Sequence, residues 1–165
     1  MVDLSSRPPP TAFSEHSGLL GVRVMESINI CLFRLSKGRV GGTIFGAPVI
    51  LLTTSGRKTG TRHTKPLLAL EDGESWIIVG SRGGTSHHPD WYLNLMAHTG
   101  DPGQFRAPEV EAAGDVNVAV HAVDLRGDER DLWWQRLVAI YPKFDAYQQR
   151  APDRQIPVIR LTPTH

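Results

Sequence analysis

Short apolar runs bounded by turn residues predict strands in the middle of the chain. Residues 49–54 read Val-Ile-Leu-Leu-Thr-Thr, residues 67–70 read Leu-Leu-Ala-Leu, and residues 75–81 read Ser-Trp-Ile-Ile-Val-Gly-Ser. Runs this short, between segments rich in Gly, Ser and Pro, are typical of strands. The segment 55–66 between the first two runs is therefore predicted to be a turn that joins two strands.

The remaining pattern adds strands and helices to a mainly β chain. Further strands are predicted at residues 104–111, 115–124 and 156–161, and helices at about residues 89–97, 126–141 and 144–147. Val116, Val118 and Val120 alternate with other residue types, which is typical of a half-buried strand. The whole chain is predicted to be mainly β with flanking helices, an α+β arrangement.

The first 38 residues differ from the rest. Residues 1–12 contain Arg7-Pro8-Pro9-Pro10 and are predicted to be a disordered or extended tail. An amphipathic helix is predicted over residues 13–38, because apolar residues recur there at spacings of three or four. Charged side chains interrupt this pattern, so it predicts no transmembrane span. The preferred interpretation packs the helix on the body of the protein or on a partner subunit, and the alternative lays it on a membrane surface.

The segment 55–66 concentrates positive charge. Arg57, Lys58, Arg62 and Lys65 fall within it, whereas the net charge of the whole chain is only +1. Cationic side chains and free backbone N–H groups in a tight turn can hold an anion. The alternative is an ordinary solvated surface turn.

A second candidate anion site follows the strand at 75–81. This strand leads into Arg82-Gly83-Gly84, after which Pro89 and Asp90 begin a helix. Proline suits the first helical turn, and the helix dipole favours an aspartate there. Backbone N–H groups at the junction of a glycine-rich loop and a helix are well placed to bind phosphate or carboxylate. The spacing matches neither the P-loop nor the dinucleotide-binding glycine motif.

Composition limits the classes of function. The chain has 165 residues, 40% of them hydrophobic and 21% charged, which predicts one soluble domain. Cys31 is the single cysteine, so no internal disulfide is possible and a cytoplasmic location is predicted. His87 and His88 are adjacent and lack a supporting Cys or His cluster, so no metal site is predicted. An aromatic content of 7% without an extended basic stripe argues against nucleic-acid binding.

Several motifs occur together in an order seen in a known family. They are Gly56-Arg57-Lys58-Thr59-Gly60, Lys65-Pro66-Leu67, Gly80-Ser81-Arg82-Gly83-Gly84, Pro89-Asp90-Trp91-Tyr92-Leu93-Asn94-Leu95, Tyr141-Pro142, Tyr147 and Arg154-Gln155-Ile156-Pro157-Val158. The chain resembles the deazaflavin-dependent nitroreductase family of actinobacteria, over roughly residues 40 to 163. The resemblance implies a split β-barrel, related to the FMN-binding split barrels, as a deazaflavin-binding domain over residues 39–165. It also implies coenzyme F420 as cofactor, whose phosphodiester and oligoglutamate tail are strongly anionic.

The resemblance further implies a set of site residues. Cofactor contacts are expected from Arg57, Lys58, Thr59, Arg62, His63, Lys65, Pro66, Gly80, Ser81, Arg82, Gly83, Gly84, Pro89, Asp90 and Trp91. Substrate contacts are expected from Leu68, Tyr141, Phe144 and Tyr147. The source of the proton stays open among Tyr147, Tyr141, Ser81, His88 and solvent.

The chain departs from the family pattern at several of these positions. His63 stands where many members carry arginine, with Arg62 one position earlier, and Arg82 replaces a loop lysine. Phe144 replaces a tyrosine thought to help protonate the substrate, and Leu68 replaces an aromatic residue. These changes put nitroimidazole-type activity in question and leave hydride transfer from the cofactor as the expectation.

The predicted function is an F420H2-dependent reductase that transfers a hydride to a small lipophilic electrophile, such as a quinone, an enone or a nitroaromatic compound. One alternative is an FMN-binding split-barrel oxidoreductase, in which part of the basic turn would have no partner. The other is a non-catalytic deazaflavin carrier. A monomer or homodimer is expected in the cytoplasm, with peripheral membrane contact through the N-terminal helix left open.

Overall fold

The computed structural model describes residues 27–44, 46–101, 103, 105–114 and 116–164. Residues 27–35 are helical, while the predicted tail at 1–12 and residues 13–26 of the predicted N-terminal helix lie outside the described residues. None of the helices in the described part of the chain has the length and apolar character needed to cross a membrane.

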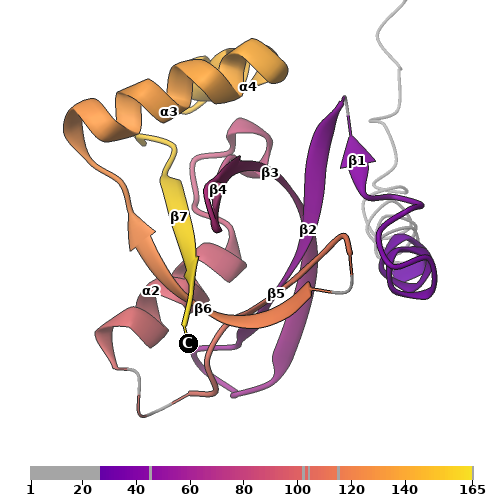
Figure 1. Ribbon diagram of the computed structural model, residues 1–165. Coiled ribbons are helices and arrows are strands. Elements are labelled where there is room, and N and C mark those ends of the chain that lie inside the picture. The colour runs from indigo at the N-terminus through magenta and orange to yellow at the C-terminus, as the bar shows by residue number, and fades with distance from the viewer. Residues whose placement is uncertain (1–26, 45, 102, 104, 115, 165) are drawn as a thin grey trace, which may run out of the picture.

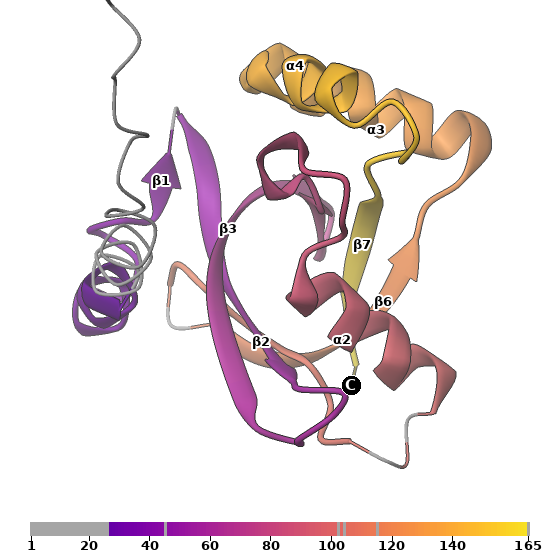
Figure 2. The same cartoon turned by 180° about the vertical axis from the view of Figure 1, so that it is seen from behind.

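Six antiparallel strands of the described chain close into a barrel (Figures 1 and 2). They are β2 (Ala47–Ser55), β3 (Arg62–Asp72), β4 (Ser75–Val79), β7 (Val158–Pro163), β6 (Val116–Asp124) and β5 (Glu109–Ala112), in that order around the barrel. The ring closes where β5 pairs with β2, with Leu52 opposite Val110. A short strand, β1 (Thr43–Ile44), pairs with the start of β2. This arrangement confirms the predicted mainly β class with flanking helices.

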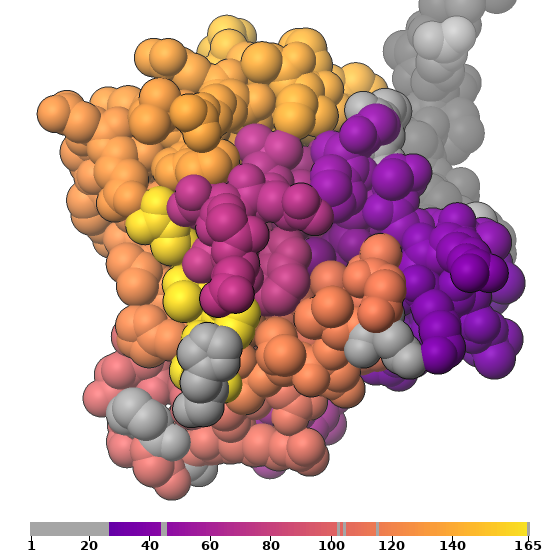
Figure 3. All heavy atoms as spheres, in the orientation of Figure 1, coloured from indigo at the N-terminus to yellow at the C-terminus, as the bar shows by residue number. Residues whose placement is uncertain are grey.

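The helices lie around the barrel. A single helical turn, η1 (Arg82–Gly84), follows β4 and precedes α2 (Asp90–Gly100), and α3 (Gly127–Ile140) and α4 (Lys143–Arg150) connect β6 to β7. In Figure 3, α3 and α4 cover one end of the molecule and residues 27–44 lie along its side.

Several strand boundaries differ from the sequence prediction by one or two residues, and the starts of β3 and β5 differ by five. β3 begins at Arg62 instead of residue 67, because Arg62 to Pro66 continue the ladder with β2 in register from Ser55 back to Leu51. The predicted turn at 55–66 is therefore shorter, and two of its four cations stand on a strand. β5 begins at Glu109 instead of residue 104, since this is where pairing with β2 and β6 begins.

The apolar run of β2 is explained by burial of both of its faces. Ile50 and Leu52 point into the main core inside the barrel. Val49 and Leu51 point outward and pack against Phe33 of the helix at residues 27–35. Side chains alternate between the two faces of a strand, so a strand covered on both sides is apolar throughout.

Two further layers complete the core. From α2, Trp91, Tyr92 and Leu95 pack into the main core. A second cluster lies between the barrel and the helical pair α3–α4, and includes Ile77, Val79, Trp133, Leu137, Phe144 and Val158. The barrel thus holds β3, η1, α2 and α4 in fixed positions around the residues predicted to bind the cofactor.

Candidate functional site

The hairpin between β2 and β3 turns over residues 56–61. The Gly56 N–H donates to Thr61 O at 2.7 Å, and the Gly60 N–H donates to Gly56 O at 2.7 Å. Gly60 has a φ of +70°, a conformation that glycine adopts without strain. This tight turn fixes the backbone of the residues that carry two of the predicted cations.

Helix α2 holds Arg57 in place. The Arg57 backbone N–H and its guanidinium both donate to Asn94 Oδ1 at 3.1 Å, and the guanidinium also contacts Asp90 Oδ1 at 3.3 Å. Asn94 is buried, and its amide nitrogen lies 3.4 Å from Thr54 Oγ1. Asp90 and Asn94 are four residues apart, so they share one face of the helix and can both bind the same arginine.

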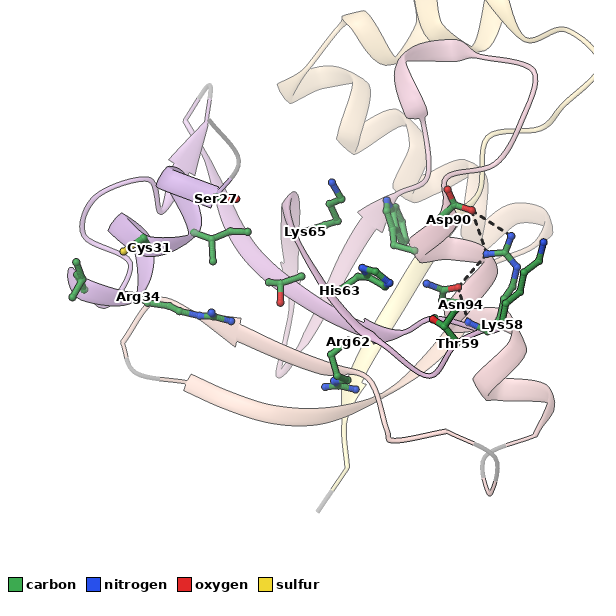
Figure 4. Close-up of a pocket in the computed structure, with 16 residues that line it drawn as sticks. Ser27, Cys31, Arg34, Lys58, Thr59, Arg62, His63, Lys65, Asp90 and Asn94 are labelled. Atoms are coloured by element: carbon green, nitrogen blue, oxygen red, sulfur yellow. Dashed lines mark hydrogen bonds and ion pairs between the residues drawn. The ribbon is translucent and has the colours of Figure 1, made fainter. Parts of the chain in front are cut away.

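A groove of about 970 Å³ lies over the hairpin, between α2 and the helix at residues 27–35 (Figure 4). Its lining comprises Ser27, Ile30, Cys31, Arg34, Leu35, Gly56, Arg57, Lys58, Thr59, Arg62, His63, Thr64, Lys65, Asp90, Trp91 and Asn94. The groove is therefore lined by the basic turn at its base and by one helix on each side.

The cations of this groove are not equivalent. Arg62 donates to Ala107 O at 2.7 Å and pairs with Glu109 at 3.0 Å, so its charge is partly balanced within the protein. Lys58 and His63 are exposed to the groove, and Lys65 is half-buried beside them. An anion in the groove would find more unbalanced charge at Lys58 than at Arg62.

A second, smaller cavity of about 220 Å³ continues along β3. It is lined by Pro66, Leu67, Leu68, Val79, Ser81, Tyr141, Phe144 and Tyr147. These residues come from β3, β4, the loop after β4, and the segment at the end of α3 and in α4. The cavity is largely apolar and aromatic, in contrast to the basic groove.

Three aromatic side chains form one wall of this cavity. The Tyr141 and Tyr147 hydroxyl oxygens lie 3.3 Å apart, and the Tyr141 and Phe144 rings meet edge to face at 5.0 Å. The hydrogen bond to Tyr147, together with burial, raises the pKa of Tyr141. The Tyr141 hydroxyl thus stays protonated near neutral pH, and Phe144 is buried with no proton to give.

The glycine-rich loop after β4 is held close to α4. Arg82, Gly83 and Gly84 have φ values of +45°, +64° and +78°. A Cβ on Gly84 would lie 2.6 Å from Tyr147 O, so only glycine fits against the helix backbone there. The Arg82 guanidinium turns back to donate to His88 O at 2.9 Å.

Most of the residues expected to contact cofactor or substrate line either the basic groove or the smaller cavity. The groove receives Arg57, Lys58, Thr59, Arg62, His63, Lys65, Asp90 and Trp91. The smaller cavity receives Pro66, Leu68, Ser81, Tyr141, Phe144 and Tyr147. Gly80, Arg82, Gly83, Gly84 and Pro89 lie outside both linings and shape the loop between them.

Sequence reasoning assigned no role to Asn94, Arg154 or the groove wall at residues 27–35. Asn94 could have been found as a polar residue four positions after Asp90 within an apolar helix. Arg154 sits in a segment without regular structure, and its partners are distant in sequence. No sequence signal pairs the N-terminal helix with the hairpin, because that contact depends on packing against the outer face of β2.

Known proteins resemble this chain in sequence and fold. Residues 26–163 match the family model for F420H(2)-dependent quinone reductase. An F420H(2)-dependent quinone reductase of Mycobacterium tuberculosis is 34% identical over 150 residues, covering 87% of this chain and 92% of that protein. A solved F420-H2 dependent reductase (FDR-A) is 34% identical with a TM-score of 0.58, covering 69% of this chain and 93% of that one. A second solved structure, described as a domain-swapped dimer, is 28% identical with a TM-score of 0.59, covering 90% and 98%.

These similarities confirm the predicted split β-barrel and the predicted class of F420-dependent oxidoreductases. The basic groove and the aromatic cavity are compatible with this cofactor class, because coenzyme F420 has an anionic tail and an aromatic ring system. The family model spans the hairpin, the glycine-rich loop, α2 and the α3–α4 segment together. The chain belongs to the F420H(2)-dependent quinone reductase family.

Proposed function

We propose that the protein uses reduced coenzyme F420 to reduce a small lipophilic electrophile, with a quinone as the first candidate. The observation that supports this function most strongly is the change from a basic to an apolar environment along β3. Residues 62–65 line the basic groove, and residues 66–68 line the apolar cavity. A cofactor with an anionic tail and an aromatic head needs these two environments side by side. When bound, the reduced deazaflavin supplies a hydride.

The groove would hold the phosphate and oligoglutamate tail. Lys58, His63 and Lys65 present cationic or hydrogen-bonding groups to it, and the clamped Arg57 adds a fixed charge at one end. Charge-assisted hydrogen bonds to phosphate and carboxylate are stronger than neutral ones. Because the groove is open to solvent, binding is expected to weaken as salt screens these charges.

The apolar cavity would hold the ring system and the substrate. Pro66 and Ser81 lie where they can border the ring, while Leu68 and Phe144 offer apolar surface to a lipophilic substrate. The same surface excludes water from the reacting groups. A quinone or enone suits this lining better than a charged substrate does.

Tyr147 is assigned as the proton donor. Tyr147 lines the cavity, and the Tyr141 hydroxyl lies 3.3 Å from that of Tyr147, where it can stabilise the charge left on Tyr147. A general acid must reach the atom it protonates through a hydrogen bond or one water. Ser81 is assigned a hydrogen bond to the ring, and Phe144 a purely apolar contact.

The experiment is a fluorescence titration of the purified protein with coenzyme F420 and, separately, with FMN, at several salt concentrations. Salt-sensitive binding of the deazaflavin and weak binding of FMN are expected. The variants Lys58→Met and Lys65→Met should weaken F420 binding, whereas Lys143→Met on α4 should not.

Turnover is then measured with F420H2 and a panel of quinones, enones and nitroaromatics. Tight FMN binding with weak F420 binding would overturn the proposal in favour of a flavin enzyme. Tight F420 binding without turnover of any acceptor would instead indicate a carrier.

The helix at residues 27–35 is proposed to contact a membrane surface, where lipophilic quinones are found. Ile28, Leu32, Leu35 and Val40 are exposed, and Leu35 is 79% exposed. Arg39 is exposed beside them and would suit anionic lipid. Flotation with anionic vesicles tests this contact: Leu32→Ser, at an exposed position outside the groove lining, should reduce vesicle binding. If light scattering shows a stable dimer and no vesicle binding is found, these exposed apolar residues would instead contact a second copy of the chain.

A further inference from the structure

Arg154 is a buried cation whose partners come from one distant loop. It is 7% exposed and lies in the segment between α4 and β7. Its guanidinium donates to Gly80 O at 3.0 Å, to Ser81 O at 2.8 Å and to Thr85 O at 2.9 and 3.1 Å. Among the described residues it forms no ion pair with a carboxylate. The charge is stabilised by backbone carbonyls of the loop at 80–85 alone, apart from a 3.2 Å contact with His88 Nδ1.

The loop at 80–85 needs this support because its backbone is strained. Three consecutive residues, from Arg82 to Gly84, have positive φ values, and Arg82 is not a glycine. A left-handed conformation is costly for residues with a side chain, so it persists only where surrounding contacts impose it. The guanidinium of Arg154 bonds to carbonyls on both sides of these three residues.

The same arginine is tied to the helix on the far side of the cavity. Gln148 of α4 donates from its side-chain amide to Arg154 O at 2.7 Å and to Ala151 O at 3.1 Å. The Gln148 side-chain oxygen, Oε1, accepts from the Ile156 N–H at 2.8 Å. Gln148 directly follows Tyr147, so one chain of hydrogen bonds connects the helix that carries Tyr147 to the loop that carries Ser81.

We propose that Arg154 is a positioning residue that sets the distance between Ser81 and Tyr147 across the apolar cavity. Arg154 lines neither the basic groove nor the apolar cavity, and it acts through the carbonyls it holds, that of the lining residue Ser81 among them. This inference rests on the cofactor site proposed above. Its consequence is specific: loss of Arg154 should impair the alignment of cofactor and substrate more than it impairs folding.

The test compares Arg154→Met, Arg154→Lys and the control Arg136→Met, which removes an exposed arginine of α3. Thermal melting first establishes that each variant folds. Arg154→Met is expected to lower kcat with the quinone and to weaken F420 binding, each by about tenfold or more. The variant loses several charge-assisted hydrogen bonds, so the loop no longer holds cofactor and substrate in alignment. Arg154→Lys should recover part of kcat, since lysine can still donate to two or three carbonyls. Arg136→Met should leave both values unchanged.

Hydrogen exchange of the protein without cofactor gives an independent readout. The amides of residues 83–85 should exchange faster in Arg154→Met than in the wild type, while those in β2 and β6 stay protected. If Arg154→Met does not fold, Gln148→Met provides the same comparison with a smaller expected effect, since it frees the 151–156 segment without removing the cation.

Unchanged kcat, F420 affinity and loop exchange in a folded Arg154→Met variant would overturn the positioning role. A wild-type protein that does not bind F420 would instead defeat the proposed function, while the exchange data would still decide whether Arg154 holds the loop.

Discussion

Arg57 and Asn94 are joined twice, because the backbone N–H and the guanidinium of Arg57 both donate to Asn94 Oδ1 at 3.1 Å. One buried amide thus fixes both the turn and the side chain of a cation that the cofactor tail is expected to meet. The second amide atom, Nδ2, reaches back to Thr54 on β2. The hairpin is therefore anchored to α2 before any ligand arrives, and its binding geometry is preorganised.

Asn94→Ala should loosen this anchor. We expect a loss of about 2 kcal/mol in unfolding free energy, because the buried Thr54 hydroxyl and the half-buried donors of Arg57 lose their partner. F420 binding should weaken as the turn becomes mobile. Urea unfolding and F420 titration measure the two effects, with Asn117→Ala on the exposed face of β6 as control. Equal F420 affinity in Asn94→Ala and the control would show that the anchor does not serve binding.

Glu109→Gln should strengthen cofactor binding. Arg62 lines the groove but pairs with Glu109 at 3.0 Å, so neutralising this carboxylate leaves more positive charge for the anionic tail. We expect the F420 dissociation constant to fall by roughly two- to fivefold at low salt, since the pair is only partly screened by solvent. Glu71→Gln, at an exposed position of β3, should have no such effect. Weaker binding in Glu109→Gln would mean that the pair holds Arg62 in its binding position.

Tyr147→Phe tests the proton donor. Removing the hydroxyl should lower kcat by roughly 10- to 100-fold while F420 affinity stays the same, as expected for the loss of a general acid. Tyr141→Phe should have a smaller effect, because it removes only the hydroxyl that lies 3.3 Å from Tyr147. Single-turnover oxidation of F420H2 in H2O and D2O measures the step. A wild-type rate in Tyr147→Phe would exclude Tyr147 as the donor and leave Tyr141, Ser81, His88 and solvent.

Gly84→Ala should displace the loop from α4. Its φ of +78° is unfavourable for alanine, and the new Cβ would lie 2.6 Å from Tyr147 O. Gly73→Ala provides a matched control, with a φ of +61° and open space around the Cβ. We expect the control to lose about 1 kcal/mol of stability and Gly84→Ala clearly more. Similar melting temperatures for the two variants would show that the loop can move away without cost.

His88 should make stability depend on pH. Burial, and then the positive charge of Arg154, lowers the pKa of His88, while Asp124 acts in the opposite direction and Arg126 in the same one. The Tyr92 ring also packs against the imidazole. The folded protein therefore prefers neutral His88, whose Nδ1 faces the Arg154 guanidinium.

The direction of this pH effect follows from linkage. The unfolded chain protonates this histidine near its usual value of about 6.5, before the folded protein does, so the contribution is complete above that pH. It is lost progressively as pH falls from there toward the lower pKa of the folded state. Urea unfolding at pH 8 and at pH 5.5 should show a smaller pH-dependent loss in His88→Gln than in the wild type. An equal loss in both proteins would exclude His88 as its cause.

The sequence determined the strands and the chemistry of the site through local patterns. The apolar run of β2 and the alternation in β6 predict strands because side-chain direction has a period of two. The cations at 57–65 and the glycines at 83 and 84 likewise predict an anion site and a loop with unusual backbone angles. The resemblance of these motifs to F420-using proteins then supplied the barrel and the cofactor class, both of which are confirmed.

Only the tertiary structure decided how these parts meet. It shows that Arg62 is paired with Glu109, that Arg57 is held by Asn94, and that Arg154 supports a loop about 70 positions away in sequence. It also shows that the helix at 27–35 forms one wall of the basic groove. These contacts join segments that approach one another only when the barrel closes and its outer faces are covered. No local pattern specifies such pairings, because they depend on how the whole chain packs to bury its apolar surface.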